Sequence, residues 1–249
     1  MITFICPGRT SPHRSQGLGV LLLGALLNLS GSQTAAADTL RAVETPLDAL
    51  ASTAAIVEGR VAAHTATYDD QAGPRTIAHL IDLTPHFGIY QDRTLPLASL
   101  GGRITDDRWM FIPELPRLTD DTRYLVFLTN SDWFFSPVVE NYLFRLEPGP
   151  RGGDVLIAPS GHAVVGLTAE GVEFTEEPVV DTQIDFLRPY ARPAVLDPAQ
   201  LAGALSKEAF LAGIRELLRT APLQGTFRPA PAADRVWNRT VTTEEPPAR

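Results

Sequence analysis

The sequence predicts a mainly β fold, a small OB-like barrel or a sandwich, followed by a C-terminal amphipathic helix. Three observations carry this prediction. Apolar and polar residues alternate over 55–65 and again over 76–83, which is the period of a half-buried strand. Turn signals recur about every 8–12 residues up to 178, a spacing typical of all-β sandwiches and barrels. Apolar residues then repeat with a helical period over 210–218.

The elements are expected in the following order. A short helix begins at Thr45, because Thr45 is a good N-cap and Pro46 fits the first helical position. The continuous apolar run from Tyr124 to Leu128 predicts a central strand. The expected strand over 95–100 ends at Gly101-Gly102. The full set of expected strands is 55–65, 76–83, 95–100, 124–128, 138–146, 154–158, 163–165 and 172–174, with 109–112 ambiguous.

The C-terminal third changes character. A helical segment is expected over 197–221; it restarts at Ser206, an N-cap, and carries Phe210 and Ile214 on its apolar stripe. From 222 the chain is rich in proline and has no periodicity, which predicts a disordered tail over 222–249. The mainly β domain is therefore expected to span 38–196, after a leader over 1–37.

That leader has the three parts of a secretory signal peptide. Arg9 and Arg14 lie in a segment without acidic residues, an apolar run extends from 18 to 29, and Ala35-Ala36-Ala37 resembles a cleavage site. The run is shorter than the ~20 residues that span a bilayer. We expect a secreted or periplasmic protein, cleaved near Ala37, with no stable membrane span after leader removal. Because Cys6 is the only cysteine, the mature chain is expected to lack thiols and disulfides.

Charge and motif content narrow the function. The formal net charge of −8 argues against nucleic acid as a partner. Lys207 is the only lysine, and we interpret the excess of arginine as genomic base composition rather than as an arginine site. The chain has no zinc-protease motif, no phosphate-binding glycine loop and no nucleophile elbow. We therefore expect no cofactor, no metal site and no catalytic residues.

Several weaker candidates remain. Ser160 and His162 are the nearest approach to a hydrolase site, but in extended chain they lie about 6–7 Å apart, too far to pair, and Pro-Ser-Gly-His is an ordinary turn. The aspartate pairs at 69–70, 106–107 and 120–121 are interpreted as solvated turns, with calcium binding left open. His64 and His79 lie on adjacent expected strands and could meet as a cross-strand pair, but two histidines alone make a poor ligand site.

Aromatic residues supply the one candidate binding surface. Trp133, Phe134 and Phe135 are consecutive and lie next to turn residues. Together with Trp109, they predict either an exposed binding surface or core filling. For Trp109 the core is the favoured location.

The order of elements also carries a resemblance. A short helix and a strand over 50–61, a second strand over 77–83, a Gly-Gly turn at 101–102 and a strand over 123–128 are similar to a broad group of uncharacterised secreted bacterial proteins. The layout of 45–175 also resembles the OB-fold module of netrin-like domains and tissue metalloproteinase inhibitors. Those inhibitors ligate the protease zinc through an N-terminal cysteine, which the expected mature chain lacks. The resemblance thus implies an architecture and no inhibitory mechanism.

Taken together, these patterns predict a secreted, non-enzymatic binding or interaction module whose ligand is an unknown protein or small molecule. Two alternatives remain open: a helper or inhibitor of a secreted protease, and a hydrolase with an unrecognised site.

Overall fold

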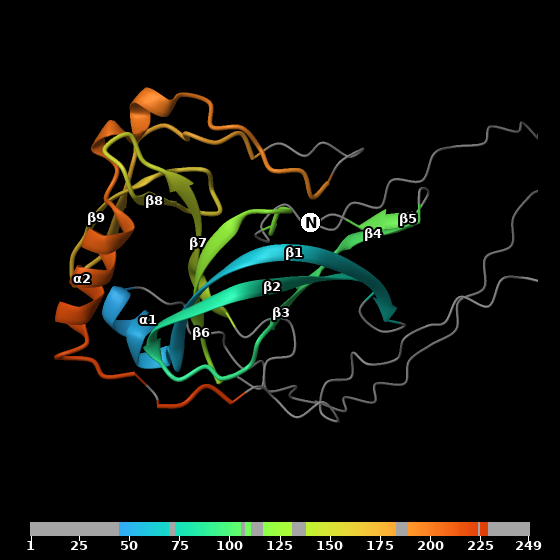
Figure 1. The fold of residues 1–249 in the computed structure, drawn as a ribbon, viewed down its shortest axis with the longest axis horizontal. Coiled ribbons are helices and arrows are strands. Elements are labelled where there is room, and N and C mark those ends of the chain that lie inside the picture. The colour runs from blue at the N-terminus through green and yellow to red at the C-terminus, as the bar shows by residue number, and fades with distance from the viewer. Residues whose placement is uncertain are drawn as a thin grey trace, which may run out of the picture. The chain divides into compact units, whose positions relative to one another are not determined.

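The computed structural model describes residues 45–69, 73–105, 108–110, 117–130, 138–182, 189–223 and 225–228. Within these ranges the chain is mainly β with a helix near its C-terminal end, which confirms the predicted fold class. The expected leader at 1–37 lies outside them. The elements, labelled in Figure 1 where there is room, are α1 (Pro46–Ser52), β1 (Ala55–Asp69), β2 (Gly73–Gly88), β3 (Leu95–Leu100), β4 (Gly102–Thr105), β5 (Arg108–Met110), β6 (Arg123–Leu128), β7 (Val138–Pro148), β8 (Asp154–Ile157), β9 (Val164–Leu167), β10 (Val172–Phe174), the 3-10 helix η1 (Pro198–Gly203) and α2 (Lys207–Leu217).

One antiparallel sheet with the order β3-β2-β1-β6-β7-β8 organises the domain. Two small hairpins, β4-β5 and β9-β10, accompany it. The long, curved β1 and β2 cross the middle of Figure 1. In the described residues β3 and β8 are the two ends of this strand order and do not pair with each other, so the sheet does not close into a barrel, which was one of the two predicted alternatives.

The β1–β2 ladder is interrupted by bulges that change which side chains share a face. Its register shifts near Val57, between Glu58 and Arg60, and between Val61 and Ala63. Asp82, which has a positive φ of 54°, lies in the second interruption. Each bulge adds a residue to one strand and reverses the inward and outward alternation beyond it.

Both faces of the sheet are covered by apolar side chains. The helix face carries Ile56 and Phe127, against which α1 and α2 pack. The opposite face carries Val57 and Val126 and forms a second cluster with the side chains of β2 and β3. Neighbouring residues of β6 and β7 therefore point to opposite faces, because side chains alternate along a strand.

The helix termini follow the predicted capping. The Thr45 hydroxyl accepts the amide of Asp48 at 3.2 Å, and the Ser206 hydroxyl accepts the amide of Ala209 at 3.1 Å. On α2, the Phe210 ring packs among the aromatic side chains of β6 and β7. No helix in the described ranges is long and apolar enough to cross a membrane.

Part of the segment expected to be a disordered tail is packed instead. Phe227 is buried in the cluster on the opposite face, with its ring 5.6 Å from that of Tyr90. Asn130 fixes the same stretch, since its side chain bonds the carbonyl of Thr226 and the amide of Arg228. The missed signal is a single phenylalanine between prolines; the remainder of the expected tail, 229–249, lies outside the described residues.

Candidate functional site

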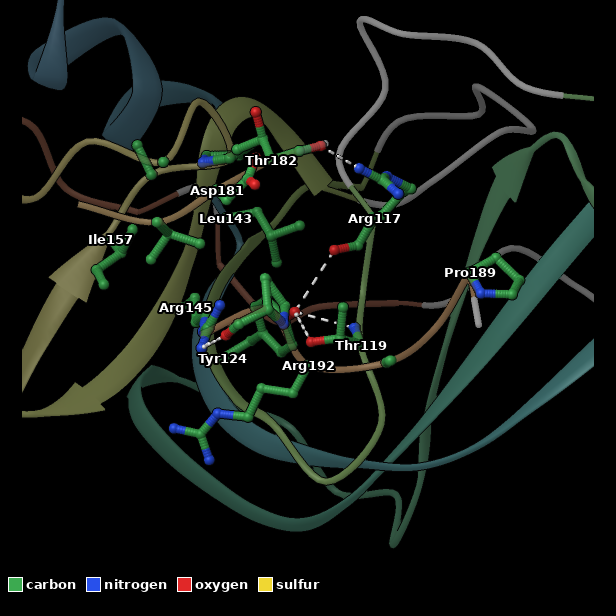
Figure 2. Close-up of a pocket in the computed structure, with 16 residues that line it drawn as sticks. Arg117, Thr119, Tyr124, Leu143, Arg145, Ile157, Asp181, Thr182, Pro189 and Arg192 are labelled. Carbon is green, nitrogen blue, oxygen red and sulfur yellow. Dashed lines mark hydrogen bonds between the residues drawn. The ribbon is translucent and has the colours of Figure 1, made fainter. Parts of the chain in front are cut away.

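A cavity of about 340 Å³ lies on the opposite face of the sheet. It is bounded by β6, β7 and the end of β8, by the turn at 158–161, and by the segments 180–182 and 189–193 (Figure 2). These parts come from distant places in the sequence and meet because β6, β7 and β8 are neighbours in the sheet. The polar side chains that line it and carry the argument below are Arg117, Thr119, Tyr124, Arg145 and Arg192.

Arg145 and Glu147 form the buried base of this site. They are two residues apart on β7, so both point to the opposite face, and their side chains are 8% and 4% exposed. Arg145 Nε donates to the Glu147 carboxylate, and Arg145 Nη2 donates to the carbonyl of Pro193 at 2.8 Å. Arg145 Nη1 is buried and has no hydrogen-bond partner in the part of the chain described.

Arg192 completes the pairing of Glu147 from the other side. Its Nε donates to Glu147 Oε1 at 3.2 Å, and its Nη2 donates to Oε2. Both carboxylate oxygens are therefore engaged by guanidinium groups, which is what keeps a buried charge tolerable. The Arg192 side chain is 44% exposed, so it reaches from solvent to the buried carboxylate.

Tyr124 and Arg117 form another part of the lining. The Tyr124 hydroxyl accepts the amide of Thr119 at 3.0 Å, and burial raises the pKa of this phenol. Arg117 Nη2 donates to the carbonyl of Thr182. Burial lowers the pKa of Arg117 from its ordinary value, although an arginine stays protonated at neutral pH. Figure 2 shows these bonds as dashed lines.

The described residues that line the cavity include more arginines than carboxylates. Arg117, Arg145 and Arg192 contribute three positive charges, and among the described lining residues only Asp181 is acidic. Glu147 lies behind the lining and neutralises one more. Counted over the described residues alone, the arginines exceed the carboxylates by one, in a chain whose formal net charge is −8. A cleft with walls of low dielectric constant concentrates the electric field of its charges, and a positive field attracts anions.

The segment 189–193 is held over the sheet by a separate cluster. The ring of Tyr190 stacks on that of His64 with centroids 4.2 Å apart, and its hydroxyl lies 2.9 Å from Thr76 Oγ1. His64 Nδ1 lies 2.8 Å from a carboxylate oxygen of Asp120, and its Nε2 lies 3.0 Å from the carbonyl of Leu118. These contacts fix the backbone that presents Arg192 and Pro193 to the cavity.

The predicted pairing of His64 with His79 is wrong. The bulge at Val61–Ala63 places Ala63, not His64, opposite His79. His79 Nε2 lies 3.1 Å from the hydroxyl of Thr65, while His64 turns to Asp120. Simple alternation along β1 could not reveal this, because it assumes an uninterrupted register.

A second charged cluster lies on the helix face, around Glu58. Lys207 Nζ is 3.0 Å from Glu58 Oε2 and 3.2 Å from Asp154 Oδ2. Arg123 Nε donates to Glu58 Oε1 at 3.0 Å, and His86 Nε2 lies 3.0 Å from Oε2. The cluster joins the first turn of α2 to β1, β6 and β8, and sequence analysis did not find it.

The pKa of Glu58 reflects that environment. Burial raises it, because a desolvated carboxylate is less stable. Hydrogen bonds from His86, Arg123 and Lys207 outweigh burial and lower the pKa to about 2. Glu58 is therefore ionised at neutral pH and acts as a structural anchor.

The remaining sequence candidates have the following outcomes. Ser160 is exposed in a tight loop, closed by a bond from the Gly161 amide to the Ala158 carbonyl at 2.9 Å. His162 Nδ1 lies 2.8 Å from the carbonyl of Thr175, and no hydrogen bond joins His162 to Ser160 among the described residues. Asp120 and Asp121 lie in a turn, as expected, but their carboxylates reach β1, where Asp120 contacts His64 and Asp121 pairs with Arg60.

Other candidates fall where little is described. Trp133, Phe134 and Phe135 lie outside the described residues, as do Asp70, Asp106 and Asp107. In the ranges that are described, no three histidine, cysteine, aspartate or glutamate side chains are placed to hold a metal.

The fold is a mainly β domain with a cavity lined by arginines. Comparisons with family models, with curated proteins and with solved structures find no match to the chain. The geometry of the cavity therefore carries the functional argument.

Proposed function

We propose that this protein is a non-enzymatic, extracytoplasmic binding module that holds a small-molecule ligand in the cavity beside Tyr124 and Arg145. The observation that supports it most is the composition of the cavity, about 340 Å³ in volume, where a few fixed polar groups meet an apolar wall. That combination and that size are typical of ligand sites. Leu143, Ile157 and Val180 supply the apolar wall.

The polar groups are already positioned, which favours binding. Tyr124 is fixed by Thr119, and Arg145 is fixed by Glu147 and by the carbonyl of Pro193. A ligand that meets such groups loses little free energy in ordering them. The extracytoplasmic location rests on the leader. It is supported if the exported protein has the mass of a chain that begins at Asp38.

The binding proposal is tested by obstructing the cavity. Ala191 lines it and is half-buried, whereas Ala194, three residues further along the same segment, is exposed and is not among the lining residues. We expect Ala191→Trp to fill the cavity and Ala194→Trp to leave it open. Circular dichroism first confirms that both variants fold.

The readout is a thermal-shift screen of a diverse small-molecule library. A ligand present at about 100 times its Kd stabilises the folded state by about 2.7 kcal/mol. Compounds that bind in the cavity raise the Tm of the wild type and of Ala194→Trp but not that of Ala191→Trp. If no compound distinguishes these two variants, the proposal is wrong.

A further inference from the structure

We propose that the cavity selects a small organic anion, with an oxyanion head group on a compact apolar body. This inference rests on the proposed function and adds the chemical class of its ligand. It follows from three features of the site: the excess of arginines over carboxylates among its described residues, an unused donor of Arg145, and the position of the apolar wall.

The described charges around the cavity favour an anionic over a cationic ligand. Among the described residues, Glu147 is the carboxylate that contacts Arg145 and Arg192, and these two arginines bond both of its oxygens. Asp181 is exposed. A cation entering the cavity would meet three arginines and, among the described lining residues, one carboxylate, whereas an anion would meet more guanidinium groups than carboxylates.

The unused Nη1 donor of Arg145 favours a ligand that carries an oxygen acceptor. Arg145 lines the cavity, and its Nη1 is buried with no partner in the part of the chain described, while Nε and Nη2 are bonded. A buried guanidinium nitrogen without an acceptor is costly, and charged oxygen acceptors satisfy it best. Arginine forks match the planar geometry of carboxylates and the oxygens of phosphates.

The apolar wall specifies the rest of the ligand. Leu143 and Ile157 lie on β7 and β8, and Val180 packs against Ile157 in a buried cluster. A cavity of about 340 Å³ accommodates a single ring or a short branched chain beside the head group. An inorganic ion alone would leave this wall in contact with water.

The test compares four probes by isothermal titration calorimetry on the purified full chain. Benzoate and phenyl phosphate carry the two oxyanion head groups on one ring; benzamide is the neutral isostere of benzoate; acetate has the head group without the ring. We expect benzoate or phenyl phosphate to bind at least tenfold more tightly than benzamide, and benzoate more tightly than acetate. The stronger of the two anions identifies the head group as carboxylate or phosphate.

Variants connect this preference to the arginines. We expect Arg117→Gln and Arg192→Gln each to weaken the preferred anion by about 10-fold or more, the usual consequence of losing a hydrogen bond to a charged group. Arg219→Gln is the matched control, because Arg219 pairs with Glu216 on the exposed surface of α2. The paired change Arg145→Gln with Glu147→Gln removes both buried charges together, and circular dichroism checks its folding.

The possible results separate the two proposals. If benzamide binds as well as benzoate, and Ala191→Trp abolishes both, the cavity is a ligand site but the anion inference is wrong. If the anions bind equally to wild type, Arg117→Gln and Arg192→Gln, the inference is also wrong. If neither the probes nor the library distinguishes Ala191→Trp from Ala194→Trp, the proposed function itself fails.

Discussion

Replacing Glu58 by glutamine tests whether the helix-face cluster anchors α2 to the sheet. Glu58 is 8% exposed and is bonded by Arg123, Lys207 and His86. Glutamine keeps the size of the side chain but removes its charge. The two cations then retain only Asp154 as a carboxylate partner.

The magnitude follows from the pKa. The pKa of Glu58 falls from 4.5 to about 2 on folding, a change of roughly 2.5 units, and each unit corresponds to 1.36 kcal/mol. We therefore expect Glu58→Gln to lower the free energy of unfolding at pH 7 by about 3 kcal/mol. Loss of one partner of a buried ion pair usually costs a similar amount.

The same shift fixes the pH dependence. A carboxylate whose pKa is depressed by folding contributes its full stability above its unfolded pKa of 4.5 and loses it as the pH falls through its folded pKa of about 2. The difference between wild type and Glu58→Gln should therefore be largest at pH 7 and should shrink progressively below pH 4.5. Urea denaturation followed by far-ultraviolet circular dichroism measures it at pH 7, 4 and 2.5.

An exposed pair provides the control. Glu216 pairs with Arg219 on α2, with side chains 66% and 72% exposed. Glu216→Gln should change the free energy of unfolding by less than about 0.5 kcal/mol. The reasoning is refuted if Glu58→Gln behaves like Glu216→Gln at pH 7, or if its deficit is as large at pH 2.5 as at pH 7.

Two further predictions concern the backbone and the C-terminal segment. Gly88 has a φ of +73°, and an added Cβ would lie 2.3 Å from a backbone carbonyl oxygen, so Gly88→Ala should destabilise the fold by about 3 kcal/mol in urea denaturation. Gly171→Ala, with open space around its Cβ, should stay within about 0.5 kcal/mol of wild type, and equal effects of the two would contradict the argument. Deleting 225–249 removes the buried Phe227 and should lower the Tm, whereas deleting 230–249 should leave it unchanged if Phe227 is the anchor.

The strands were predictable because each has a clear period and clear ends. The expected strand over 95–100 coincides with β3, and the expected strand over 124–128 differs from β6 by one residue. The strand β4 was missed because Gly101-Gly102 was interpreted as a terminator. Both glycines have positive φ, and a new strand begins at Gly102 itself. A glycine pair can turn the chain without ending pairing.

The cavity was much less predictable. Arg117, Arg145 and Arg192 are separated by tens of residues, and their segments meet through the strand order β6-β7-β8 and through the contacts of Tyr190 with His64 and Thr76. These arginines were not singled out, because the excess of arginine over lysine was interpreted as genomic base composition. One local signal was available: Arg145 and Glu147 lie at alternate positions after the apolar run Tyr142–Phe144, which places two charges on the face that also carries the buried Leu143.

The two charged clusters differ in how their charges are matched, and this difference bears on the proposed binding role of the cavity. On the helix face the negative charges of Glu58 and Asp154 are matched by the positive charges of Arg123 and Lys207, and these groups bond one another. On the opposite face the arginines outnumber the carboxylates near them, and Arg145 keeps a buried donor without a partner in the described ranges.

Because Arg123 and Tyr124 are consecutive on β6, one strand contributes to both clusters. A network in which each charge is already paired has no charged group left for a ligand to pair with. An unbalanced one carries a desolvation cost that an anion would reduce, so substitutions around Glu58 should alter stability, and substitutions of Arg117 or Arg192 should alter binding.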